Sequence, residues 1–193
     1  MNKHLIESAS FCPAMKKIKK VMNGSSWALI GGRAVEVHTN PPQTPDIDIL
    51  CDASGVDACD LINAFKSIGV VLTMPYEEGD IIFLIDKALD VEIDVLPTYD
   101  GFDVRAIKRA KNATCNGVGF PVVQPEDLIV MKTQAASSAG GGMMGRSKEK
   151  VKHDMDAIRT LIKEVDLDKD YIVKVLRAER WFDELRLLRK LGL

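Results

Sequence analysis

The stretch WALIGGRAVEVHTNPPQTPDIDIL, residues 27–50, decides the fold that we expect for this chain. It begins with a short apolar run that meets Gly31-Gly32, after which residues 33–38 have helical rather than strand character. Three prolines within residues 40–45 require a loop, and residues 46–50 largely alternate polar and apolar side chains, as a half-buried strand does. The stretch therefore predicts a strand, a glycine turn, a helix, a loop and a second strand.

The sequence on either side predicts more strands and a helical C-terminal third. The further strands form two hairpins, 81–85 with 90–96 and 114–116 with 120–123. The further helices are expected at 13–22, 57–68, 102–111, from Pro125 onward, and at 148–163, 169–177 and 179–191. Because strands come first and helices last, we expect an α+β fold rather than a doubly wound parallel sheet. A small mixed β-sheet flanked by helices would occupy residues 1–124, and a C-terminal helical bundle would occupy residues 125–193.

The composition indicates a folded, soluble chain. Hydrophobic residues make up 46 % and charged residues 28 % of the 193 residues, which is ordinary for a globular domain. No apolar run reaches the length of about 18 residues that a membrane span requires. The 26 Lys and Arg residues against 28 Asp and Glu residues give a net charge of −2, which excludes wholesale nucleic-acid binding. Any contact with nucleic acid must be local.

The N-terminal segment and the cysteines indicate the compartment. Residues 1–22 contain no apolar core of signal-peptide length. The four cysteines, Cys12, Cys51, Cys59 and Cys115, show no CxxC spacing, and a chain of this size does not need disulfides to fold. We therefore expect four reduced thiols in a cytoplasmic protein, without a zinc site.

Acidic residues gather on the predicted sheet. Successive side chains of a strand point to opposite faces, so Asp46 and Asp48 share one face of their strand. Glu92 and Asp94 share a face of a later strand in the same way. If the two strands are neighbours, three or four carboxylates converge with no apolar residue between them.

Converging carboxylates favour a bound cation. Like charges on a rigid sheet raise one another's pKa, a cost that a divalent ion removes. Carboxylates prefer Mg²⁺ or Mn²⁺, which also bind substrate phosphates and stabilise the oxygens of an in-line phosphoryl displacement. Phosphoryl or nucleotidyl transfer is therefore the natural chemistry. An isolated Asp-x-Asp pair, however, is more often a pair of charges on a solvent-facing strand.

The glycine turn adds a second indication. Gly31-Gly32 lies where a strand ends and a helix begins, which offers free backbone N–H groups and a positive dipole end to a phosphate. The alternative is that the two glycines only permit a tight turn. Together, the glycine turn and the acidic residues indicate chemistry on a phosphate group more specifically than either feature does alone.

The combined motifs resemble the polymerase-beta-like nucleotidyltransferase superfamily. The matching elements are Gly31-Gly32-Arg33-Ala34, then Thr44-x-Asp46-x-Asp48, then Asp94 on a later strand. Two downstream segments resemble the AbiEii-type and minimal nucleotidyltransferase branch of that superfamily. These segments are Pro125-Glu126-Asp127-Leu128 with Lys132, and Lys152-His153-Asp154-Met155-Asp156-Ala157-Ile158. The resemblance spans about residues 24 to 162.

The resemblance implies a reaction and assigns residues to it. A nucleoside triphosphate would be held at Gly31, Gly32, Arg33, Thr44 and Lys132. The implied catalytic residues and ligands of two Mg²⁺ or Mn²⁺ ions are Asp46, Asp48 and Asp94. A hydroxyl of a small molecule, a protein or an RNA end would attack the α-phosphate and release pyrophosphate, with Asp94 helping to remove its proton.

Two departures from the superfamily pattern keep a second hypothesis open. Pro42 stands where many relatives carry Arg, and Gly32 stands where many carry Ser. Arg33 is a candidate substitute for the missing Arg. The alternative function is a non-catalytic nucleotide- or partner-binding protein on the same scaffold.

Several other patterns bear on the acceptor and on assembly. Residues 140–147 approach a P-loop but carry Arg146 where Lys is expected and follow a helix rather than a strand. They suit either a loop that borders the cleft or a plain flexible linker. Arg105, Lys108 and Arg109 share a helical face, which slightly favours a basic rim for tRNA over an acidic pocket for a cationic drug. The apolar residues of 179–191 suit bundle packing or a homodimer contact.

Overall fold

The computed structural model describes residues 10–39, 44–77, 79–137 and 147–193. It is a mixed α and β fold whose seven described strands form one sheet. The strands are β1 (Trp27–Ile30), β2 (Ile47–Asp52), β3 (Val70–Leu72), β4 (Ile82–Asp86), β5 (Val91–Thr98), β6 (Lys111–Cys115) and β7 (Val118–Val122). The helices are α1 (Phe11–Val21), α2 (Gly31–His38), α3 (Ala58–Lys66), α4 (Gly101–Arg109), α5 (Pro125–Ser137), α6 (Lys148–Glu164), α7 (Lys169–Ala178) and α8 (Phe182–Lys190).

The sheet is mixed, with the order β3-β4-β5-β2-β1-β7-β6. The central pair β2 and β5 is parallel, as is the pair β1 and β7. The other neighbouring pairs, including β1 with β2 and β4 with β5, are antiparallel. The two strands that carry the predicted acids are therefore direct neighbours.

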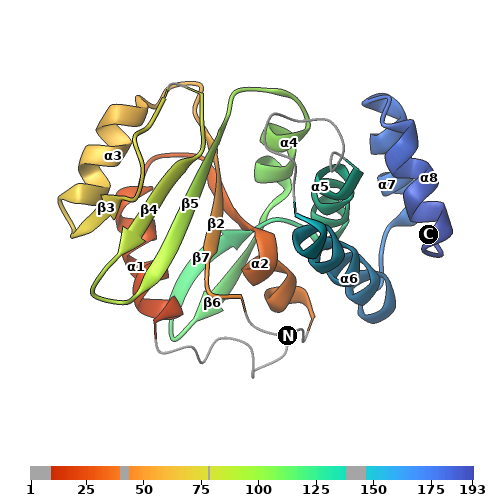
Figure 1. Cartoon of the computed structure of the whole chain (residues 1–193), viewed down its shortest axis with the longest axis horizontal. Coiled ribbons are helices and arrows are strands. Elements are labelled where there is room, and N and C mark those ends of the chain that lie inside the picture. The colour runs from red at the N-terminus through yellow and green to blue at the C-terminus, as the bar shows by residue number, and fades with distance from the viewer. Residues whose placement is uncertain (1–9, 40–43, 78, 138–146) are drawn as a thin grey trace.

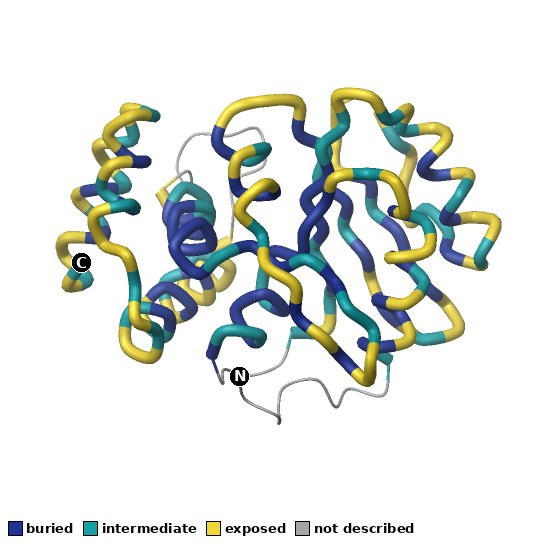
Figure 2. The backbone as a smooth tube through the Cα atoms, turned by 180° about the vertical axis from the view of Figure 1, so that it is seen from behind, coloured by how far each residue is buried: buried dark blue, intermediate teal, exposed yellow. Residues whose placement is uncertain are grey.

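The helices divide between the two sides of the sheet (Figure 1). Helix α1 lies behind the sheet, while α2 and α4–α6 gather beside β1 and β2, and α7 and α8 extend the molecule toward the C-terminus. The central strands and the inner faces of α5 and α6 are buried, whereas α7 and α8 have exposed outer faces (Figure 2). None of the described helices combines the length and apolar character that a membrane crossing needs.

The predicted α+β class and mixed sheet are confirmed, with local differences. Strand β3 was not expected, because its three residues are too short for an alternating pattern. The basic helix ends at Arg109 rather than at residue 111, and Lys111 instead begins β6. The glycine-rich segment 138–146, where a cleft loop was predicted, and Pro42 lie outside the described residues.

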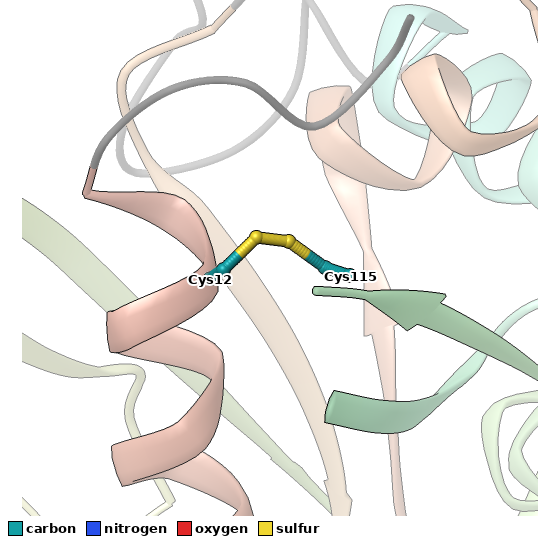
Figure 3. Close-up of a disulfide and its surroundings, with 2 residues drawn as sticks. All are labelled: Cys12 and Cys115. Atoms are coloured by element: carbon teal, nitrogen blue, oxygen red, sulfur yellow. A yellow bond between two sulfur atoms is a disulfide. The ribbon is translucent and has the colours of Figure 1, made fainter. Parts of the chain in front are cut away.

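A disulfide corrects the expectation of four reduced thiols. Cys12 of α1 is joined to Cys115 of β6, which lie 103 residues apart in the chain and 5.7 Å apart at their Cα atoms (Figure 3). Cys51 and Cys59 are free, the first buried and the second exposed. The pairing of Cys12 with Cys115 depends on the packing of α1 beside the β6–β7 hairpin, which their positions in the sequence do not reveal.

The disulfide should contribute to the stability of the fold. Replacing both half-cystines (Cys12→Ser with Cys115→Ser) is expected to lower the free energy of unfolding by about 2–4 kcal/mol. Without the cross-link, the unfolded chain is no longer constrained by a long closed loop and gains conformational entropy. Urea unfolding under non-reducing conditions measures the change. Cys59→Ser, at an exposed free thiol, is the matched control and should leave the midpoint unchanged. Four titratable thiols in the unreduced, denatured wild type would contradict the pairing.

Candidate active site

The central strands bring two predicted acids together. Asp48 of β2 is the register partner of Asp94 of β5, so both side chains leave the same face of the sheet next to each other. Asp46 directly precedes β2 and lies on that same face by alternation. Both Asp48 and Asp94 are half-buried. The convergence that the sequence indicated is thus present in the fold.

The environment of Asp94 is electrostatically costly. The pKa of Asp94 is raised to about 6, mainly by burial and also by the nearby charges of Asp46 and Glu92. Lys150 of α6 acts in the opposite direction. Within the described ranges, no three His, Cys, Asp or Glu side chains stand close enough together to hold a metal ion by themselves. The acids therefore form a repulsive group rather than a finished metal cage.

The glycine turn is built around Asp48. Gly31 begins α2 with φ +68°, a conformation that favours glycine. A Cβ atom at Gly31 would lie 1.7 Å from Oδ2 of Asp48. A Cβ atom at Gly32 would lie 2.4 Å from Cγ2 of Thr44, so a side chain such as that of Ser at this position would displace Thr44. Because neither glycine has a side chain, the N-terminus of α2 lies close to Asp48 and Thr44.

Arg33 and Glu36 form a buried support beneath this turn. Arg33 donates to Oε2 of Glu36 at 2.9 Å, and its guanidinium lies 5.2 Å from the ring centroid of Phe11. Burial raises the pKa of Glu36, although the hydrogen bond from Thr44 and the interactions with Arg33 oppose the shift. Arg33 is only 6 % exposed, so the structure places this predicted phosphate ligand in the interior instead.

Thr44 has one satisfied and one unsatisfied polar group. Its backbone N–H donates to Oε1 of Glu36 at 2.7 Å. Its side-chain oxygen Oγ1 is buried and has no hydrogen-bond partner among the described residues. A buried hydroxyl without a partner costs free energy, so it marks a position where a ligand oxygen can be bound.

Lys132 and Asp154 join helices α5 and α6 beside the predicted site. Nζ of Lys132 on α5 donates to Oδ1 of Asp154 on α6 at 2.8 Å, and Lys132 is 8 % exposed. Both residues line a hollow of about 360 Å³ that also reaches Gly32, Asp46 and Asp48. The hollow therefore joins the glycine turn and the acids of β2 to the predicted lysine.

Helix α6 supplies lining residues that were not among the predicted site residues. They are Glu149, Lys150 and His153, together with Asp154. Their spacing places them on one side of the predicted helix 148–163, but only the fold shows that this side faces the acids. His153 and Asp154 belong to the segment that carries the resemblance, whereas no motif indicated Glu149 and Lys150.

The basic face of α4 is engaged within the protein. Arg105 forms an ion pair with Glu179. Arg109 donates to Oδ2 of Asp127 at 3.0 Å and lies 3.8 Å from the ring centroid of Tyr171. Two of the three cations that favoured a basic rim for tRNA are thereby neutralised by carboxylates of the C-terminal helices.

The comparisons with known proteins support the fold. No family model matches the chain, and no curated protein matches its sequence. The solved structure of ANT(2″)-Ia in complex with adenylyl-2″-tobramycin matches with a TM-score of 0.60 at 14 % identity, covering 88 % of this chain and 97 % of that one. A nucleotidyltransferase from Thermotoga maritima matches with a TM-score of 0.56 at 16 % identity, covering 71 % and 91 %.

A third structure has the same architecture. The lincosamide antibiotic adenylyltransferase LnuA, with lincomycin bound, matches with a TM-score of 0.51 at 16 % identity, covering 79 % of this chain and 94 % of that one. The chain therefore has the fold of nucleotidyltransferases, as the sequence motifs predicted. The assignment to the AbiEii-type branch stays a prediction.

A substitution at Gly31 tests the close approach to Asp48. Gly31→Ala should lower the free energy of unfolding by more than Gly117→Ala does, because both positions have positive φ but only Gly31 faces a side chain within 4 Å. We expect about 1–2 kcal/mol for Gly117→Ala from the backbone conformation alone. Urea unfolding of the two variants gives the comparison. Equal losses would show that Asp48 moves aside without cost.

Proposed function

We propose that this chain is a metal-dependent nucleotidyltransferase that moves a nucleoside monophosphate from a nucleoside triphosphate to a hydroxyl acceptor. The observation that carries the proposal is the pairing of Asp48 with Asp94, directly against the glycine turn at the start of α2. A phosphate-binding turn next to paired acids suits chemistry at a phosphorus atom. The fold, shared with adenylyltransferases, agrees with it.

The divalent ion would be held by Asp46, Asp48 and Asp94, whose donors are all carboxylate oxygens and therefore suit Mg²⁺ or Mn²⁺. Burial, and after it the charges of Asp46 and Glu92, raise the pKa of Asp94, and a bound cation would offset both effects. Because the side chains alone do not form a cage, substrate phosphates would have to complete the coordination. A bound ion would supply positive charge that stabilises the phosphate oxygens and the leaving pyrophosphate.

The phosphate side of the site is formed by the start of α2 and by α5. Backbone N–H groups at Gly31 and Gly32 would bind the β- and γ-phosphates, aided by Lys132. The unsatisfied hydroxyl of Thr44 replaces the Ser hydroxyl that Gly32 lacks. Arg33 acts indirectly, because it holds Glu36, which in turn holds the backbone of Thr44.

The transfer step uses Asp94 as the proton acceptor. The acceptor oxygen attacks the α-phosphorus and forms a new P–O bond. The bond from that phosphorus to the bridging oxygen breaks, and pyrophosphate leaves with the electron pair. The proton of the attacking hydroxyl passes to the carboxylate of Asp94. The reaction thereby conserves charge and atoms without any further reactant.

Metal-dependent triphosphate binding is the first test. Each of the four ribonucleoside triphosphates is added with and without Mg²⁺ while thermal unfolding is followed. At about 100 times its dissociation constant, a ligand should stabilise the wild type by about 2.7 kcal/mol. The isosteric change Asp48→Asn should abolish the Mg²⁺-dependent shift, whereas Asp166→Asn, at an exposed loop position, should preserve it.

Turnover separates the enzyme from a non-catalytic nucleotide-binding protein. Pyrophosphate release is measured with a pool of hydroxyl acceptors. We expect release from the wild type and at least a hundredfold slower release from Asp94→Asn. Triphosphate binding that does not require metal, without pyrophosphate release from any acceptor, would instead favour the non-catalytic alternative.

The role of Thr44 gives a prediction with two readouts. Thr44→Val removes a buried hydroxyl that has no partner, so the variant should be as stable as the wild type or more stable. The same change should weaken triphosphate binding about tenfold, because a hydrogen bond to a charged oxygen is worth about 1.5–3 kcal/mol. Urea unfolding and titration with triphosphate measure the two effects. Unchanged affinity would remove Thr44 from the phosphate site.

A further inference from the structure

Strand β4 carries apolar residues on both of its faces. Ile82 and Leu84 point into the core and are 1 % exposed. Phe83 and Ile85 point to the opposite face and are half-buried, and Ile81, which directly precedes the strand, is 38 % exposed. An antiparallel strand with one face toward solvent normally carries polar residues on that face. The exposed face of β4 therefore has the composition of a surface that binds something apolar.

This apolar face is continuous with the candidate active site. Phe83 is the register partner of Asp94, and Ile85 is the register partner of Glu92, so all four side chains share one face of the sheet. We call Ile81, Phe83, Ile85 and Glu92 the β4–β5 platform. In Figure 1 no described helix lies over the front of β4 and β5. The platform therefore adjoins Asp94 on the same face of the sheet, and no described helix covers it.

The platform lies on the side from which an acceptor must attack. The sheet order places β4 and β5 on one side of β2, and β1 with its glycine turn on the other. Pyrophosphate would leave toward the turn, and in-line displacement requires the nucleophile to approach from the opposite direction. The acceptor hydroxyl must therefore reach the α-phosphorus past Asp94, from the platform.

The charge of the platform selects among acceptors. Glu92 is exposed and has no ion pair with any described cation. Together with Asp46 and Asp94 it makes the approach acidic, which repels the phosphates of an RNA end. The half-buried ring of Phe83 beside Asp94 offers both an apolar surface and a cation–π contact.

We infer that the acceptor is a hydroxyl compound that carries a protonated amine beside an apolar face, and that Glu92 and Phe83 select it. This inference rests on the proposed nucleotidyl transfer and specifies its second substrate. Glu92 binds the ammonium group next to Asp94, and the apolar side chains of the β4–β5 platform bind the apolar face of the acceptor. The pairing of Arg105 and Arg109 with carboxylates of the C-terminal region weakens the competing case for RNA.

An acceptor panel tests the inference. It contains free-amine glucosamine oligosaccharides, hydroxylated polyamines and amino alcohols with an apolar chain, the N-acetylated form of each, and total tRNA. Transfer is measured as label from triphosphate carrying ³²P at the α-phosphate. We expect at least one free-amine compound to be labelled at least tenfold faster than its N-acetylated form, and no labelling of tRNA. Labelling confined to tRNA or to N-acetylated compounds would overturn the inference.

Two variants with matched controls test the residues. For the best acceptor, Glu92→Gln and Phe83→Ala should each raise the acceptor KM about tenfold while the KM for triphosphate stays unchanged. The controls Glu77→Gln and Phe182→Ala alter an exposed acid and an exposed phenylalanine outside the platform, and should change neither constant. Unchanged acceptor KM in both platform variants would also overturn the inference.

The outcomes distinguish this inference from the function on which it rests. Metal-dependent triphosphate binding that is retained while no free-amine compound is labelled refutes the cationic acceptor and leaves nucleotidyl transfer standing. Loss of metal-dependent triphosphate binding in the wild type refutes both.

Discussion

The parallel pairing of β2 with β5 is the constraint on which the rest of the structure depends. It fixes Asp48 beside Asp94 on one face, where Asp94 also lies near the repelling charges of Asp46 and Glu92. The same register buries Ile47 beside Ile93 on the other face, both fully shielded from solvent. Apolar burial on the back of the strands thus holds in place a pair of carboxylates that would otherwise separate. A rigid sheet can sustain such a repulsion where a loop would relax.

The packing around Asp48 follows from that constraint in a chain of contacts. Because Asp48 occupies the space beside Gly31 and Thr44 fills the space beside Gly32, a side chain at either position would displace one of these two residues. Thr44 is in turn fixed through Glu36, which Arg33 neutralises. The interior position of Arg33 is therefore part of how the turn is held. Its buried charge is compensated by Glu36 and by the ring of Phe11.

Sequence patterns predicted the features that local periodicity encodes. The alternation around Asp48, the turn at Gly31 and the helical C-terminal third correspond to β2, the start of α2 and α5–α8. What the sequence did not reveal depends on contacts between distant segments: the Cys12–Cys115 disulfide, and the side of α6 that faces the acids. The helical spacing of Arg105 and Arg109 indicated a basic face correctly, yet their acidic partners come from elements that no local pattern places nearby.

The two sides of the paired acids differ in chemistry, and the difference gives the site a direction. Toward β1 lie the positive end of α2, Lys132 and an unsatisfied hydroxyl, which suit phosphate oxygens. Toward β4 lie an additional carboxylate, Glu92, and the apolar side chains of Phe83 and Ile85, which do not suit phosphate oxygens. In the proposed function, a triphosphate would bind with its leaving group toward α2. Its α-phosphorus would then face β4, and the composition of that strand, which carries no catalytic motif, would decide which acceptor reacts.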